Sequence, residues 1–133
     1  KDSGFDVTFN PETGKVTIAD CAIQGWGLKG NIKNAEGNDD QWSSTFPMTL
    51  QDGIWVSEEL EFLWDGTSTW GFKLCLYGNW DAGDIGVASG TTPQKGVAMT
   101  AVDKLVEGSN SNINFNGTGV VKFDPTAMTI TIE

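Results

Sequence analysis

The chain has 133 residues, 8 basic against 18 acidic residues, a formal net charge of −10 and no histidine. A chain of this length is expected to form one domain that buries its own core. The excess of acidic residues argues against binding to nucleic acid or to anionic membranes, because a protein needs a cationic face to bind either. Without histidine the commonest general base and zinc ligand are missing. The 6 Trp are more than one core of this size needs, which favours a binding surface.

The first expected strands lie at residues 5–9 and 15–24, where apolar and polar residues alternate around an Asn-Pro turn. The same alternating pattern occurs near the end of the chain around an Asp-Pro turn, and its residue Phe123 lies 114 residues after Phe9 (123 − 9 = 114). This alternation predicts a β-hairpin in both places. A constant offset indicates a module repeated in tandem, so residues 1–18 would be the tail of a preceding module. Convergence on a common hairpin pattern is the alternative.

Further strand patterns follow in chain order, at residues 46–50, 54–62, 71–77, 113–115, 120–123 and 128–132. Asp52-Gly53 predicts a tight turn, and residues 99–106 fit either a strand or a short helical turn. Short strands separated by Gly, Asn and Asp turns predict an all-β domain. The architecture expected is an immunoglobulin-like antiparallel β-sandwich, with residues 1–133 as a single domain.

Three long polar loops are expected, at residues 25–41, 64–69 and 81–94. Long loops on a rigid scaffold usually carry recognition. Residues 34–40 offer oxygen ligands at close spacing but lack the EF-hand order, so a solvated turn is expected and calcium is the alternative. Cys21 and Cys75 lie in apolar runs, which leaves open both buried thiols and a disulfide between them.

The most specific local run is F-K-L-C-L-Y-G-N-W at residues 72–80. On a strand, alternation places Lys73 and Tyr77 on the outer face, and the turn that follows brings Trp80 into a loop. An indole can lie flat under a pyranose ring while an ammonium group donates to hydroxyl oxygens. The run therefore predicts a sugar-binding site.

This run resembles a strand of the family 48 glycogen- and starch-binding modules, in which a lysine precedes a tryptophan by seven residues, as Lys73 precedes Trp80 (80 − 73 = 7). The stretch D-Q-W-S-S-T-F-P-M-T at residues 40–49 is similar to the family's N-N-W…L-P-L-T segment and places Trp42 at its first stacking tryptophan. Asn112 falls where that family has a sugar-contacting asparagine. The order of motifs is still more similar to the repeated SusE/SusF-type surface glycan-binding (starch-binding) modules of Bacteroidetes.

The resemblance implies a non-catalytic module that binds a polysaccharide or oligosaccharide, without cofactor or metal, outside the cell or at a bacterial cell surface. It would be a monomeric unit of a multimodular protein and would not insert into a membrane, since no stretch approaches the roughly 20 apolar residues of a span. A curved α-glucan such as starch or glycogen suits two angled aromatic rings. A β-linked glycan (xylan, β-glucan or glucomannan) and an adhesion role without sugar binding are the alternatives.

The remaining candidate site residues are aromatic. Trp26, Trp64 and Trp70 lie in two insertions and either extend the ligand platform or anchor their loops, and Tyr77 shares the outer face of Lys73. A glycosidase would need two carboxylates across a cleft, about 5–9.5 Å apart. No acidic residue lies in an aromatic motif that would raise its pKa, so no enzyme is expected.

Overall fold

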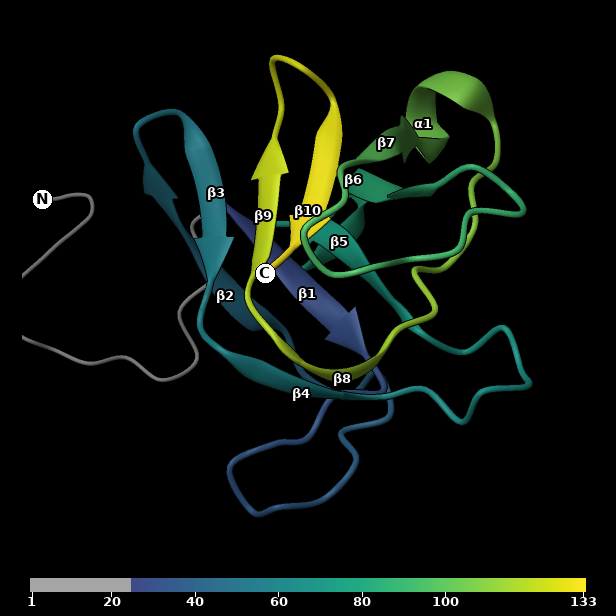
Figure 1. The fold of residues 1–133 in the computed structure, drawn as a ribbon. Coiled ribbons are helices and arrows are strands. Elements are labelled where there is room, and N and C mark those ends of the chain that lie inside the picture. Colours follow the sequence, from purple (N-terminus) through teal and green to yellow (C-terminus); the bar gives the residue numbers. More distant parts are fainter. Residues whose placement is uncertain (1–24) are drawn as a thin grey trace, which may run out of the picture.

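A computed structural model describes residues 25–133, which form an all-β domain as predicted (Figure 1). The strands of this region are β1 (Trp26–Gly30), β2 (Phe46–Gln51), β3 (Ile54–Ser57), β4 (Leu60–Leu63), β5 (Phe72–Leu76), β6 (Asn79–Val87), β7 (Met99–Asp103), β8 (Asn116–Gly119), β9 (Val121–Asp124) and β10 (Thr129–Ile132). A helical turn, α1 (Lys104–Glu107), follows β7. No helix of the described region is long and apolar enough to cross a membrane. The expected N-terminal hairpin at residues 5–24 lies outside the described residues.

Eight of the described strands close into one antiparallel barrel, in the order β1-β2-β3-β9-β10-β7-β6-β5 and back to β1. The prediction of an immunoglobulin-like sandwich is therefore wrong. A sandwich has two sheets that face each other and do not pair at their edges. Here β1 pairs with β2 on one side and β5 on the other, and β3 pairs with β9, so backbone hydrogen bonds continue around the whole barrel.

The interior of the barrel is filled by apolar side chains from alternate positions of the strands. Leu28, Leu74 and Phe123 are at most 1% exposed. Strands β4 and β8 pair with each other outside the barrel sheet and run across its lower end (Figure 1). Phe62 of β4 closes that end, because its ring packs 4.6 Å from the ring of Phe72.

Two tight turns set the register of neighbouring hairpins. Asp52 and Gly53 have φ of 52° and 83° between β2 and β3, which confirms the predicted turn. Tyr77 and Gly78 have φ of 56° and 68° between β5 and β6. Positive φ at both central residues is the pattern of a type I′ hairpin turn. The second turn leads directly into β6, so Trp80 lies on a strand and not in the expected loop.

Two of the expected loops contain strands. β1 lies within residues 25–41, and β6 takes up the first half of residues 81–94. Residues 81–87 were expected in a polar loop, but the glycines of β6 permit close packing in a strand: a Cβ on Gly83 would lie 2.6 Å from the indole of Trp26. The strand expected at 54–62 is divided into β3 and β4. Residues 99–106, which fitted either a strand or a helical turn, contain both: strand β7 and then the start of α1.

Candidate functional site

Three tryptophan side chains from separate segments of the chain gather on one part of the barrel surface. The ring centroids of Trp42 and Trp80 are 6.0 Å apart with planes tilted by 40°, and those of Trp42 and Trp70 are 6.2 Å apart at 80°. We call these three residues the tryptophan platform. Trp70 is 61% exposed, and Trp42 and Trp80 are partly exposed. The platform thus offers neighbouring aromatic rings to a ligand.

Trp42 is held by an unusual backbone conformation. Gln41 and Trp42 have φ of 51° and 67°, in the left-handed region that side chains disfavour, and such residues persist where their surroundings fix them. The Trp42 N–H donates to the Gly30 carbonyl at 3.0 Å, and the Asp39 carboxylate accepts from the Gln41 N–H at 3.0 Å. The indole Nε1 of Trp42 is enclosed and finds no acceptor within residues 25–133. The ring, and not its N–H, is therefore the part of Trp42 that can meet a ligand.

Strands β5 and β6 bring Lys73 and Trp80 together. The Nζ of Lys73 lies 5.6 Å from the ring centroid of Trp80, within the range of a cation–π contact. Cys75 pairs with Asp84, whereas Leu76 pairs with Asn79, so the pairing register shifts here by the four intervening residues of β6, 80–83. Irregular pairing, as in β-bulges, re-aims side chains, and Trp80 lies in this irregular stretch within reach of Lys73.

The charge of Lys73 is neutralised by a nearly buried carboxylate. The Nζ of Lys73 lies 2.7 Å from Oδ1 of Asp84, and the two side chains are 12% and 9% exposed. The Nδ2 of Asn110 donates to the same carboxylate oxygen at 3.2 Å. Lys73 therefore supports the Trp80 ring while adding no net charge to the platform. Its ammonium group still has N–H donors beyond the one used in the ion pair.

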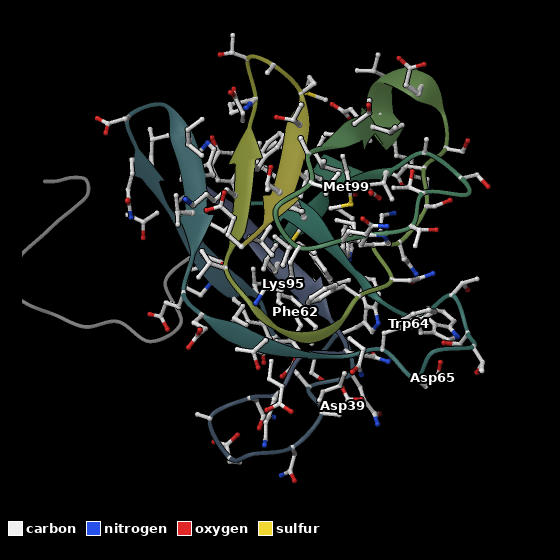
Figure 2. The ribbon with its side chains drawn as sticks, in the orientation of Figure 1. Asp39, Phe62, Trp64, Asp65, Lys95 and Met99 are labelled. Atoms are coloured by element: carbon white, nitrogen blue, oxygen red, sulfur yellow. The ribbon has the colours of Figure 1, made fainter. Side chains whose placement is uncertain are left out.

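The loop between β4 and β5 is fixed by its own hydrogen bonds. The Nε1 of Trp64 donates to the Ser68 carbonyl at 2.8 Å, and the Asp65 carboxylate accepts from the N–H groups of Ser68 and Thr67 at 2.8 and 2.9 Å. The Ser68 N–H, followed by that of Thr67, lowers the pKa of Asp65. Figure 2 shows Trp64 and Asp65 in this loop, which projects from the barrel. Trp64 therefore clasps the loop.

A polar groove of about 780 Å³ lies beside this loop. Its lining comes from Trp64 and Thr69, from the segment 88–93 and from the run 110–116 except Ile113, and we call it the asparagine groove. The Nδ2 of Asn116 donates to the Trp64 carbonyl at 2.7 Å, and that of Asn112 donates to the Thr69 carbonyl. These two amides tie the loop to the run that forms the opposite wall.

Six of the eight predicted site residues lie at one of these two places. Four of them come together at or beside the platform, namely Trp42, Trp70, Lys73 and Trp80. Two lie at the groove, Trp64 and Asn112. The sequence thus pointed to both places without showing that they differ.

The two other predicted residues lie elsewhere. The ring of Trp26 is 5.3 Å from that of Phe123 at 80°, and it packs against the buried core. Trp26 was expected in a loop, either in the ligand platform or as an anchor. It lies on strand β1 and packs against the core. Tyr77 is 56% exposed at the turn between β5 and β6, and its position follows from the hairpin geometry.

Two features of the site were not predicted from the sequence. Asp84 gave no signal, because its contact with Lys73 depends on how β5 pairs with β6, where Asp84 lies opposite Cys75. The asparagine groove did have a signal in the sequence, because asparagines occupy every second position from Asn110 to Asn116. In an extended segment such spacing places side chains on one face.

The acidic segment at residues 34–40 uses its oxygens on its own backbone. The Asn34 side-chain oxygen accepts from the N–H groups of Glu36 and Asn38 at 3.1 and 3.0 Å. Within residues 25–133, no three His, Cys, Asp or Glu side chains are grouped as they would be to hold a metal ion. The arrangement is that of a turn closed by an Asn side chain.

Cys75 lies on β5 with no exposed surface. Burial raises the pKa of its thiol, and a thiol in that state is a poor nucleophile. Cys75 therefore acts as a small packing residue. Cys21, and with it the disulfide alternative, lies outside the described residues.

Comparison of the chain with protein-family models, with curated proteins and with solved structures gives no match. The resemblance to glycan-binding modules rests on the motifs around Trp42 and Lys73 and stays a prediction. The fold and the site define a class in general terms: an antiparallel β-barrel domain that carries a tryptophan platform and a polar groove.

Proposed function

We propose that this domain is a non-catalytic carbohydrate-binding module that recognises a neutral polysaccharide through the tryptophan platform. The observation that carries the proposal is the tilted pair of Trp42 and Trp80 next to the exposed Trp70. Indole faces cover the apolar faces of sugar rings. Clustered, exposed aromatic side chains mark interaction surfaces, and a domain that served only as a spacer would gain nothing from exposing them.

An α-glucan of the starch or glycogen type is the ligand that the geometry favours. The planes of Trp42 and Trp80 meet at 40°, which suits the curved ribbon of an α-glucan, whereas a flat β-1,4-linked chain is better matched by coplanar rings. The ion pair of Lys73 with Asp84 places polar atoms beside Trp80 without net charge. This favours a neutral chain over an acidic one.

The proposal places the domain in a multimodular protein outside the cell or at a bacterial cell surface, as the motif resemblance implies. Stacking on one small platform gives weak affinity, and linked modules then act through avidity.

A polysaccharide screen tests the ligand class directly. Native affinity electrophoresis against amylopectin, glycogen, xylan, mixed-linkage glucan and glucomannan should show retardation by the two α-glucans. Retardation by the β-linked glycans alone would replace the ligand assignment. No retardation by any of the five would overturn carbohydrate binding itself.

Alanine variants of the platform test the site. Trp42→Ala and Trp80→Ala should each weaken binding to amylopectin at least tenfold, roughly 1.4 kcal/mol, in isothermal titration calorimetry. Leu50→Ala is the control, because Leu50 is 53% exposed on β2 and takes no part in the platform. Unchanged affinity in both tryptophan variants would show that the platform is not the binding site.

A further inference from the structure

We infer that the asparagine groove is a second binding site, for an uncharged oligosaccharide chain, separate from the tryptophan platform. The inference deepens the proposed function and rests on it for the ligand class, but the groove has its own lining residues. Its volume of about 780 Å³ lies in the range of small-molecule sites, roughly 300–1,000 Å³.

The chemistry of the lining selects the ligand class. Of the described residues that line the groove, none carries a charge, although the chain has a net charge of −10. An anionic ligand would call for a cationic partner, and a metal cation for carboxylates. An apolar ligand would leave the amides and hydroxyls of the groove without partners. Hydroxyl groups of a sugar both donate and accept. Thr92 can do the same, Asn112 keeps its oxygen and one N–H beside its bond to Thr69, and Thr91 keeps its acceptor beside its bond to Ala88.

Asn112, Asn114 and Asn116 place a row of side-chain amides along one wall of the groove. Ser111 bridges to Val87 and Ile113 bridges to Phe72 in antiparallel fashion, so this part of the run is extended. Ile113 is fully buried, and alternation turns its neighbours Asn112 and Asn114 to the opposite face. Asn110 instead points inward, where its Nδ2 donates to the carbonyls of Asp84 and Val102. Residues two apart on an extended chain are spaced by about 6.6 Å. A row of amides at a regular interval suits a ligand that is itself a chain of repeating polar units.

An aromatic side chain completes the groove and is already in position. Trp64 is held through its Nε1 by the Ser68 carbonyl at 2.8 Å and through its own carbonyl by Asn116 at 2.7 Å. Binding therefore does not have to order this ring, and preorganisation of this kind strengthens binding. Phe115 lines the same groove and adds a second apolar surface.

The loop from Trp64 to Trp70 serves both sites. Trp70 belongs to the platform, whereas Trp64 and Thr69 line the groove. Asn112 holds this loop at the Thr69 carbonyl. Two sites that share one short loop would let a single domain hold a polysaccharide at two points.

The experiment is an NMR titration of the ¹⁵N-labelled full chain with maltohexaose, cellohexaose and xylohexaose, each to about 10 mM, where millimolar dissociation constants are still measurable. The reporters are the side-chain amides of Asn112, Asn114 and Asn116 and the indole N–H of Trp64 for the groove, and that of Trp80 for the platform. At least one hexasaccharide should shift the groove signals, and it should still shift them in Trp80→Ala.

Variants that fill the groove complete the test. Thr92 is an exposed lining residue, so Thr92→Trp should occupy the groove and weaken binding there at least tenfold while the platform signals respond as before. Thr126→Trp is the matched control, because Thr126 is exposed in the turn between β9 and β10. Trp64→Ala should act like Thr92→Trp, and Thr92→Trp keeps the test decisive if removal of Trp64 disturbs the loop.

Three outcomes are distinguishable. Groove signals that stay silent with all three sugars overturn the second site and leave the platform untouched. Groove shifts that disappear in Trp80→Ala also overturn it, because they would report one site only. A silent platform with a responsive groove overturns the proposed role of the platform and supports the groove.

Discussion

Lys73 contacts the ring of Trp80 and the carboxylate of Asp84 with one ammonium group. Its ion pair is nearly buried, so each charge depends on the other for compensation. The Asp84 carboxylate of this pair also accepts a hydrogen bond from the side-chain amide of Asn110, a residue that lines the asparagine groove. A single residue pair thus links the support of the platform to the segment that forms the second site.

Lys73→Met should lower the free energy of unfolding by about 3–5 kcal/mol, because it leaves the Asp84 carboxylate buried without a counter-charge. The double variant Lys73→Met/Asp84→Asn removes both charges and should recover most of this stability in urea denaturation. Its affinity for amylopectin should stay reduced, since Trp80 has lost the cation beside it.

The exposed pair of Lys33 and Glu61 provides the control. These side chains are 44% and 47% exposed at 3.4 Å, and Lys33→Met should change stability by less than about 1 kcal/mol. If Lys73→Met lowers the free energy of unfolding by no more than Lys33→Met does, the pair of Lys73 with Asp84 is not buried in solution. If the double variant binds as well as the original chain, Lys73 is dispensable for the ligand.

At the scale of elements, the loop between β4 and β5 depends on one carboxylate. Two backbone N–H groups donate to Asp65, and this stabilises its charged form and lowers its pKa in the folded state. The contribution of Asp65 to loop order is therefore fully present above the unfolded-state pKa of about 3.9. It is lost as the pH falls through the lower pKa of the folded state.

Acidification should loosen this loop before it unfolds the barrel. We expect the Thr67 and Ser68 amide signals to lose their native chemical shifts below about pH 4 while the core signals remain. Asp65→Asn keeps an oxygen acceptor and should remove the pH dependence, whereas Asp65→Ala should loosen the loop at neutral pH. A loop that keeps its native amide shifts in Asp65→Ala would contradict this role.

The elements themselves were only partly predictable. The β2–β3 hairpin was visible because Asp52-Gly53 is a turn signal with a local cause. Strand β6 was not, because its glycines serve contacts with distant residues, such as that between Gly83 and the ring of Trp26. A glycine kept for close packing and one kept for a turn look the same in a sequence.

At the scale of the whole molecule, the class of fold was predictable and its closure was not. Alternation shows which side of a strand is buried, and this pattern is the same in a sandwich and in a barrel. What separates the two is which strands pair, and the pairing of Leu28 with Leu74 leaves no local trace. For the same reason the motifs pointed to Trp42 and Trp80 but could not show that Trp70 joins them.

Closure of the barrel can be tested at the junction of β1 and β5, where Gly30 pairs with Phe72. A Cβ on Gly30 would collide with the backbone of Gly71 and Phe72, so Gly30→Ala should force the strands apart and lower the free energy of unfolding by about 1–3 kcal/mol. Because the Trp42 N–H donates to the Gly30 carbonyl, the same change should also weaken ligand binding at the platform.

Thr49→Ala, at an exposed position of β2, is the control, and its free energy of unfolding should stay within about 0.5 kcal/mol of that of the original chain. NOEs between the backbones of Leu28 and Leu74 report the junction in the unmodified chain. If those NOEs are missing and Gly30→Ala is as stable as the control, β1 and β5 are not joined and the barrel is open.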